Sequence, residues 1–407
     1  MKRPCLRGFC PVRRMATHRQ QIIQLTRTQG QVARPLVARS LGISLPTVTN
    51  LVKGLIADQI LIEDGFGQSQ GGRRAALLRL NPEYAYAAGA EVSLSGVNAV
   101  LMDLSGNILA SRAATSDAIT SPEATMNSLI AAVDPLLAGV SRTRLKGIGV
   151  GVAGLVDREN GVSIKFPHCD SWANVRVSNI LESRFNLPTC VDNDIQASTL
   201  AEFRYGAARG AKTFLYVHIG QGIRLGMVLD GKLFHGVHGR AGELGHIVVE
   251  EGGPICYCGN YGCLESLASP RAMINQAREA MAEGVESAIT ANATASTATL
   301  SIESVLAAAG TGDRLAVNLV ERVGHHIGLV MANLANLFDP SLFILAGKLA
   351  VGESPMVEII ERVFRRTAMP AARDSVEIRK SAFPQSPCAR GAATLVFDRM
   401  FEQMSLE

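Results

Sequence analysis

One stretch, Gly239 to Ser266, constrains the fold of this chain more than any other. It reads GRAGELGHIVVEEGGPICYCGNYGCLES and is too short and too rich in glycine to order itself by burying apolar side chains. It supplies one imidazole and three thiolates, the ligands that a tetrahedral Zn²⁺ prefers. These residues are His246, Cys256, Cys258 and Cys263. We predict a structural zinc site here. The alternative is three buried free cysteines beside an unrelated histidine. A disulfide between Cys256 and Cys258 is geometrically poor, because it would close a very small ring.

Two carboxylates lie among these ligands. Glu243 precedes His246 by three residues, and Glu265 follows Cys263 by two, so a bound metal would hold both near one place. A carboxylate accepts two hydroxyl hydrogen bonds at once, and His246 could bind zinc through one ring nitrogen and a sugar hydroxyl through the other. All four ligands come from protein, which leaves no open position for chemistry on the metal. The spacing indicates a sugar pocket beside a structural metal, with an ordinary solvated glutamate pair as the alternative.

Composition limits the class of protein. A length of 407 residues is enough for two or three domains, and 47% hydrophobic with 19% charged residues is typical of a compact soluble protein. No run approaches the roughly 18 to 20 apolar residues of a membrane span. Residues 1–17 are basic without an apolar middle, so we expect a disordered arm rather than a secretory signal, with Met15 as an alternative start. The cysteines outside the metal segment are scattered, as in cytoplasmic proteins.

Charge is concentrated at the amino-terminal end. Residues 1–80 carry thirteen Lys or Arg against three Asp or Glu, a balance of +10, whereas the whole chain sums to +4. The remaining 327 residues are therefore near −6. A basic head on an acidic body indicates that the head binds a polyanion such as double-stranded DNA. A solubilising basic tail is the alternative, since five of the thirteen charges lie in the first fourteen residues.

Helix signals follow the basic tail. Apolar residues recur at helical spacing over 18–29 and 34–41, and Ser44 is a good N-cap for a third helix whose apolar face looks inward. Short polar and cationic side chains on its outer face would read the major groove of DNA. These residues are Thr47, Thr49, Asn50 and Lys53. We predict a winged helix-turn-helix domain over 18–80, although the motif also occurs as a plain packing unit.

A glycine-rich hairpin completes the predicted head. It runs from Gly65 to Gly72 and returns along Ala75 to Leu80. Arg73 and Arg74 lie at its return, where a wing would reach the DNA backbone or minor groove.

From Ala85 the pattern changes to strands alternating with helices, as in α/β proteins. A helix is predicted over 122–137, and a buried strand over 145–152. Asp192, Asn193 and Asp194 follow at the end of a further strand and precede a helix. Open α/β sheets bind ligands at such strand ends. A second α/β unit is predicted from Thr213, with a helix over 316–338, a strand over 342–346 and a closing helix over 390–405.

Several segments resemble one known family, the ROK group (repressor, open reading frame, kinase) of sugar kinases and sugar-responsive repressors. The most specific are AGELGH with CYCGNYGCLES, then VDND at 191–194, GVGVAGLVD at 149–157 and ALLRLNP at 76–82. The resemblance covers nearly the whole chain. It implies a two-lobed, actin-like ATPase fold, with a small lobe over 81–192 that is completed by residues 390–407, and a large lobe over 193–389 that carries the zinc and sugar sites.

The resemblance also implies site residues. In the kinases, the residue that matches Asp194 is the base that deprotonates the sugar hydroxyl. His246, Cys256, Cys258 and Cys263 match the zinc ligands of the family. The implied sugar contacts are Gly154, His168, Asn193, Asp194, Glu243, His246 and Glu265.

Two segments depart from the kinases. Their opening Asp-x-Gly-Gly-Thr-Lys corresponds here to Glu91 through Gly96, with Ser93 and Leu94 in place of the glycines. Their second loop, Gly-Thr-Gly-x-Gly, ends here in Arg224. Larger side chains where backbone must approach phosphate argue against productive ATP binding. We therefore expect a transcriptional repressor of carbohydrate genes rather than an enzyme. It would be cytoplasmic, respond to a sugar or sugar phosphate, and act on operator DNA as a homodimer or homotetramer. The alternatives are a sugar kinase and a repressor with a vestigial pocket.

Overall fold

The computed structural model describes residues 17–67, 74–114, 121–167, 169–289, 300–350 and 355–404. The chain forms two compact units, one comprising the residues up to Tyr84 together with those from Arg399 on, and the other Ala85–Asp398. We refer to them as the head and the body.

In residues 17–67 and 74–84, the head contains three short α-helices and a small sheet. The helices are α1 (His18–Gln29), α2 (Arg34–Leu41) and α3 (Leu45–Ala57), as the sequence pattern predicts. The strands are β1 (Val32–Ala33), β2 (Leu61–Phe66) and β3 (Ala76–Leu80), in the order β1-β3-β2. Ser44 caps α3 by accepting a hydrogen bond from the Thr47 amide at 3.2 Å. Ile22, Leu55 and Leu78 are fully buried and form the centre of its core.

The end of the last helix, α13 (Pro387–Gln403), belongs to the head. The Arg27 guanidinium of α1 lies 4.5 Å from the centroid of the Phe401 ring, and Gln20 Nε2 donates to the Met404 carbonyl at 3.3 Å. The sequence led us to assign residues 390–407 to the small lobe of the body. The structure instead divides this helix, because its carboxyl-terminal residues find a cation–π partner and a hydrogen-bond donor on α1.

The first lobe of the body is built on a five-stranded sheet of order β11-β7-β4-β5-β6. Its strands are β4 (Tyr86–Ser93), β5 (Gly96–Asp103), β6 (Ile108–Ala114), β7 (Leu145–Val152) and β11 (Thr189–Asn193). Helices α4 (Pro122–Leu137) and α5 (Val177–Phe185) pack on it around a core that includes Leu129, Ile148 and Leu181. A small antiparallel sheet adds β8 (Leu155–Asp157), β9 (Val162–Lys165) and β10 (Ala173–Val175).

The second lobe is built on a sheet of order β14-β13-β12-β15-β16. Its strands are β12 (Phe214–Ile219), β13 (Ile223–Leu229), β14 (Lys232–Leu233), β15 (Leu342–Ala346) and β16 (Glu377–Lys380). Its helices are α7 (Leu264–Ala268), α8 (Pro270–Ala282), α9 (Ile302–Gly310), α10 (Arg314–Phe338), α11 (Met356–Thr367) and α12 (Pro370–Ser375). Long α10 packs against α11 through buried apolar side chains, and the Arg362–Glu321 ion pair joins the same two helices at the surface.

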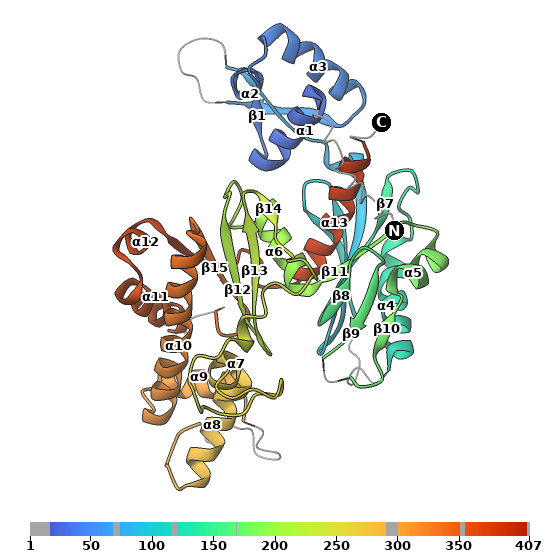
Figure 1. Ribbon diagram of the computed structural model, residues 1–407. Coiled ribbons are helices and arrows are strands. Elements are labelled where there is room, and N and C mark those ends of the chain that lie inside the picture. The colour runs from blue at the N-terminus through green and yellow to red at the C-terminus, as the bar shows by residue number, and fades with distance from the viewer. Residues whose placement is uncertain are drawn as a thin grey trace, which may run out of the picture. The chain divides into compact units, whose positions relative to one another are not determined.

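Two helices lie between the sheets, α6 (Asp194–Tyr205) and the body portion of α13 (Figure 1). Their approach is close enough to require glycine. A Cβ on Gly149 of β7 would lie 1.8 Å from the Ala392 carbonyl oxygen, and one on Gly391 would lie 1.7 Å from that of Ala197. These contacts lock α13 against both α6 and the first sheet.

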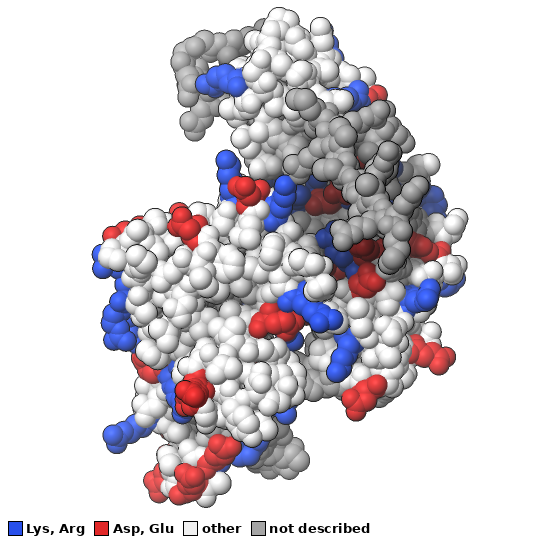
Figure 2. Space-filling model, in the orientation of Figure 1, with Lys and Arg blue, Asp and Glu red and all other residues white. Residues whose placement is uncertain are grey.

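The surface of the body carries both signs of charge. Figure 2 shows Lys and Arg side chains interspersed with Asp and Glu over the face drawn, so the acidic excess of the body is not gathered on that face. Within the described residues, no single helix is long and apolar enough to cross a membrane, although α2 and α3 taken together as a bent pair pass by length and composition.

Candidate metal centre and ligand cavity

The four predicted metal ligands converge. Their ligand atoms all lie within 4.8 Å of one another. His246 Nδ1 lies 3.6 Å from the Cys256 sulfur, and the sulfurs of Cys258 and Cys263 are 3.7 Å apart. A tetrahedral ion with Zn–S bonds of about 2.3 Å requires an S···S separation of about 3.8 Å. The donor set and its spacing therefore fit Zn²⁺.

Backbone hydrogen bonds and one glycine bring the cysteines to the histidine. The Val249 amide donates to the Gly262 carbonyl at 2.9 Å, and the Cys256 amide to the Asn260 carbonyl at 2.8 Å. Gly262 has φ +67°, and a Cβ there would lie 1.6 Å from the Glu250 carbonyl oxygen. Only glycine meets both conditions. The segment has little apolar core of its own, since Val248, Ile255 and Tyr257 are exposed.

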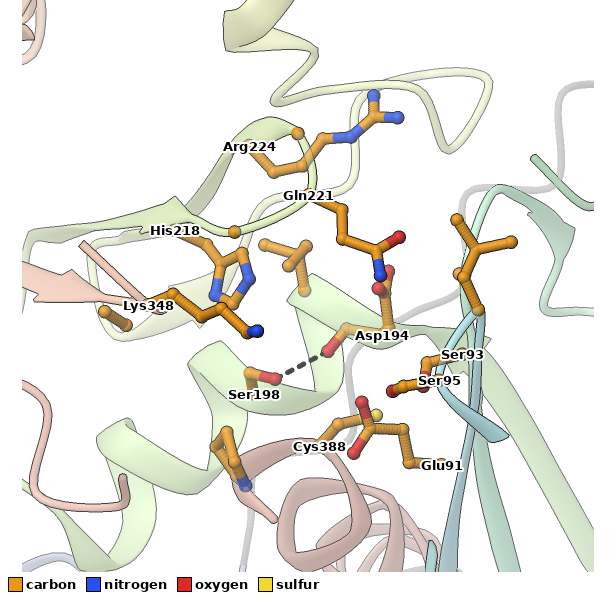
Figure 3. A pocket seen from close by; sticks show the side chains of 18 of the residues that line it. Glu91, Ser93, Ser95, Asp194, Ser198, His218, Gln221, Arg224, Lys348 and Cys388 are labelled. Carbon is orange, nitrogen blue, oxygen red and sulfur yellow. Dashed lines mark hydrogen bonds between the residues drawn. The ribbon is translucent and has the colours of Figure 1, made fainter. Parts of the chain in front are cut away.

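A cavity of about 670 Å³ opens beside the metal centre, within the usual range for small-molecule sites. Figure 3 shows one side of the cavity formed by the β12–β13 hairpin, which carries His218, Gln221 and Arg224. The other side is formed by the end of β4 and the turn after it, which carry Glu91, Ser93 and Ser95. Asp194, the first residue of α6, lies between them. Both lobes thus contribute polar side chains to one cavity.

The pKa values of two carboxyl groups at the floor of this cavity are raised. Burial raises the pKa of Glu91 to about 7, and the nearby Asp194 adds to the shift. Burial likewise raises the pKa of Asp194 to about 6, while Arg224 and hydrogen bonds at the start of α6 oppose the rise. At neutral pH the two groups are therefore not both fully ionised, and they can donate as well as accept hydrogen bonds.

The metal-side wall of the cavity is a connected polar cluster. Arg224 forms an ion pair with Glu243 and lies beside the Tyr257 hydroxyl. His246 Nε2 lies 2.9 Å from that same hydroxyl and 3.9 Å from Glu243 Oε2. Glu265 Oε2 accepts the Ile223 amide at 3.0 Å, which fixes its carboxylate at the cavity edge. Of this cluster, Arg224, Tyr257 and Glu265 line the cavity, so a guanidinium, a phenol and a carboxylate face the same space.

The structure brings together most of the residues expected at a sugar site. Gly154, Asp194 and Glu265 line the cavity, and Glu243 and His246 adjoin it through Arg224 and Tyr257. His168 lies outside the described residues.

Asn193 has mainly structural contacts. Its Nδ2 donates to the Gly154 carbonyl at 2.9 Å, and its Oδ1 caps α6 by accepting the Ile195 and Gln196 amides. These bonds hold Asp194 at the cavity.

Comparison with known proteins identifies the family. The model described as ROK family matches residues 88–399. The chain belongs to the ROK family.

Relatives match the chain almost from end to end. The putative xylose repressor of Caldicellulosiruptor sp. (strain Rt8B.4) is 28% identical over 371 residues, covering 91% of this chain and 92% of that protein. The xylose repressor of Bacillus subtilis (strain 168) is 27% identical over 383 residues, covering 92% and 93%. The DNA-binding transcriptional dual regulator NagC of Escherichia coli (strain K12) is 28% identical over 394 residues, covering 95% and 93%.

Solved structures show the same architecture. A ROK family transcriptional regulator described as a homologue of the E. coli MLC protein superposes with a TM-score of 0.79 at 25% identity, covering 95% of this chain and 97% of that one. A ROK family glucokinase from Streptomyces griseus, in complex with glucose and AMPPNP, gives 0.68 at 28% identity, covering 77% and 100%. The body therefore has the mixed α/β fold of ROK proteins.

The residues expected to contact DNA lie on or near α3 of the head. Thr47, Asn50 and Lys53 are exposed, and Arg74 is exposed before β3. Thr49 is half-buried, and its hydroxyl donates to the Leu45 carbonyl at 2.8 Å. Arg73 lies outside the described residues. Of the four residues expected on α3, three are therefore accessible to a partner.

Two residues of the ligand site were missed by the sequence reasoning. Tyr257 lines the cavity, and its place between two metal ligands in the sequence was a signal that it would lie there. Arg224 was noted only as a departure from a phosphate loop, yet it joins Glu243 to Tyr257. Its role depends on the pairing of β13 with β12, which sequence spacing does not give.

Proposed function

We propose that this ROK protein is a sugar-responsive, DNA-binding transcriptional repressor of carbohydrate uptake or catabolism genes in the cytoplasm. The observation that carries the proposal is the presence in one chain of a ROK body, whose cavity has polar side chains from both lobes, and a separate head whose α3 exposes Asn50 and Lys53. Relatives named as xylose repressors and NagC support it, because they match both parts of the chain.

A sugar kinase is the second candidate, favoured by the retention of Asp194 and by the likeness to the glucokinase. Against it, Leu94 lines the cavity where the kinases have glycine, and Arg224 occupies the last position of the second loop and pairs with Glu243. A Cβ on Gly222 would lie 2.5 Å from Glu265 Oε2, so that loop has little room to move towards a phosphate. We infer that the body binds a ligand without transferring phosphate.

We also infer that Zn²⁺ on His246, Cys256, Cys258 and Cys263 has a structural role. With four protein ligands it would order the segment rather than react. His246 would bind it through Nδ1, which faces the Cys256 sulfur, and would keep Nε2 for the ligand side. We further propose that the head is a winged helix-turn-helix domain.

The proposed response couples the cavity to the spacing of two heads in a homodimer. A sugar that touches Asp194 from one lobe and Glu265 from the other favours one angle between the lobes. DNA half-sites lie about 34 to 36 Å apart or at multiples of this, so a modest rotation misplaces one recognition helix. To switch almost the whole population, the sugar would have to bind one interlobe state about 5.5 kcal/mol more tightly than the other. We therefore expect a partial response.

The test uses the purified full-length protein. Selection from a random duplex library at low salt, followed by sequencing, should recover a palindromic site. A panel of aldoses should then release the selected duplex with saturable dose curves, and ATP should not be consumed with any of them. No enrichment of any sequence, or enrichment that no sugar alters, would count against a sugar-responsive repressor. Sugar-dependent ATP consumption would establish the kinase instead.

A further inference from the structure

Cys258 differs in exposure from the other thiols that form the candidate metal centre. Cys256 is 4% exposed and Cys263 is fully buried, whereas Cys258 is exposed. Among the cysteines in the described ranges, Cys258 alone is exposed. A thiol that binds a metal ion is deprotonated, and the thiolate is the form that attacks oxidants. One of the four proposed ligands is therefore both nucleophilic and open to solvent.

Cys258 lies at the tip of a tight turn. The Cys256 amide donates to the Asn260 carbonyl at 2.8 Å, and the Gly259 amide donates to the Cys256 carbonyl at 2.9 Å. Gly259 has φ +95°, and a Cβ there would meet no atom within 4 Å. The tip of the turn therefore has open space beside it, so Cys258 can shift without displacing a packed side chain.

Cys263 is the thiol that can join Cys258 with the least movement. Their sulfurs are 3.7 Å apart and an S–S bond is about 2.0 Å long, so the two atoms must approach by about 1.7 Å. Gly259 and Gly262 lie between the two cysteines and let the chain between them bend. A bond from Cys258 to Cys256 would instead close a very small ring. Cys263 is the N-cap of α7, so the movement falls on the exposed turn.

We propose that Cys258 is an oxidation site, at which hydrogen peroxide converts Cys258 and Cys263 into a disulfide. The Cys258 thiolate attacks one oxygen of the peroxide, the O–O bond breaks, and a sulfenic acid and hydroxide form. The Cys263 thiolate then attacks the sulfenic sulfur, the S–S bond forms, and hydroxide leaves. Hydrogen peroxide thus takes two electrons from two thiolates, and two protons from solvent complete two molecules of water.

The disulfide would empty the metal centre. Only His246 and Cys256 would remain as ligands, too few to hold Zn²⁺. Glu265 and His246 would then lose their common support, while the head keeps its own core. This last consequence rests on the proposed function: the oxidised repressor would stay on its operator in the presence of sugar. Reduction of the disulfide, followed by uptake of Zn²⁺, would restore the response.

The experiment treats the zinc-loaded, full-length protein with hydrogen peroxide. A chromogenic chelator counts the Zn²⁺ released, a thiol reagent counts the thiols lost, and fragmentation of non-reduced peptides by mass spectrometry identifies the bonded pair. We expect one Zn²⁺ to appear for every two thiols lost, together with a Cys258–Cys263 disulfide. Dithiothreitol should restore both thiols, and added Zn²⁺ should then bind again.

Two variants test the assignment. Cys258→His keeps a ligand for the metal but removes the thiol that reacts first, so it should retain Zn²⁺ at peroxide concentrations that empty the wild type. Cys190→Ser changes a half-buried cysteine outside the metal cluster and should release Zn²⁺ as the wild type does. If Cys258→His does not take up Zn²⁺, the peptide map of the wild type decides which thiols join.

The outcomes separate this inference from the proposed function. A wild type that keeps both its Zn²⁺ and its thiols in peroxide overturns the oxidation site, as does a disulfide between any other pair. Release of the selected duplex by glucose, galactose or N-acetylglucosamine is measured before and after oxidation. If none of these sugars releases the reduced protein, the sugar response fails, whereas the zinc and thiol counts still decide the oxidation site. Protein that binds no Zn²⁺ overturns the metal centre and this inference together.

Discussion

His235 Nε2 lies 3.0 Å from Asp192 Oδ2, and this contact joins the two lobes of the body. Asp192 lies near the end of β11 in the first sheet, and His235 follows β14 in the second. The guanidinium of Arg158 lies 3.1 Å from the same ring. The other carboxylate oxygen of Asp192 accepts the Asn193 amide at 2.8 Å. The cross-lobe contact is therefore two residues from Asp194 at the cavity floor.

Removing His235 should loosen the lobes. Asp192 is only 5% exposed, so His235→Ala leaves a buried carboxylate with one partner fewer, at a cost on the order of 1 to 3 kcal/mol. We expect the body to unfold at lower denaturant concentration. Asp192→Asn measures the same contact from the other side, and the double variant should cost less than the sum of the two. Additive losses in this cycle would show that the pair does not couple the lobes.

Glu91 should make the stability of the body depend on pH. Its pKa is 4.5 in an unfolded chain and about 7 in the folded body, so the folded state holds the proton more tightly. The stabilisation present below about pH 4.5 is therefore lost as the pH rises through 7. We expect Glu91→Gln to gain stability over the wild type between about pH 5 and pH 8, by on the order of 1 to 3 kcal/mol.

Thermal unfolding of both proteins across this pH range is the measurement. Glu159→Gln, at an exposed site in the same lobe, is the matched control and should follow the wild-type curve. A Glu91→Gln curve that stays parallel to the wild type would contradict the raised pKa.

The convergence of the four candidate metal ligands could be predicted from sequence because they are local. His246 and Cys263 are seventeen residues apart, and the glycines between them limit the paths of the chain. The helices of the head were predictable for a similar reason, since N-caps and apolar spacing act within one or two turns. Asp194 was placed correctly at a strand end because the pattern of a buried strand followed by a helix is strong.

Contacts between distant segments could not be predicted in this way. Asp192 and His235 are forty-three residues apart, and they meet only because β11 and β14 belong to lobes that fold towards each other. Strand β16 has only four residues, with charges that mask its alternation, so its pairing with β15 gives no sequence signal. The division of α13 between head and body likewise depends on which partner Phe401 finds.

Loss of one metal ligand should disable the ligand site without unfolding the head. Cys258→Ser removes one thiolate from a segment with little core of its own, so Glu265 and His246 lose their common support. We expect one Zn²⁺ per chain in the wild type and none in the variant, with sugar binding abolished and duplex binding at low salt retained.

Metal analysis and titration with the best-binding sugar are the measurements. Cys190→Ser, which changes a half-buried cysteine outside the metal cluster, is the control and should keep both zinc and sugar affinity. Full sugar binding by metal-free Cys258→Ser protein would separate the pocket from the metal.

Lys53 and Asn50 should differ in their effect on DNA binding. Both are exposed on α3, but a lysine contributes through phosphate charge, whereas an asparagine can bind the edge of adenine. Lys53→Gln should weaken binding to all duplexes by a similar factor and lower the slope of log affinity against log salt by about one. Asn50→Ala should cost about 1 to 3 kcal/mol of binding free energy on the selected site and relax the preference at one base pair.

Fluorescence anisotropy over a salt series, on the selected duplex and its single-base variants, distinguishes the two effects. Lys232→Gln on the body is the matched control; if it reduced the slope as much as Lys53→Gln does, α3 would not be the element that meets the DNA.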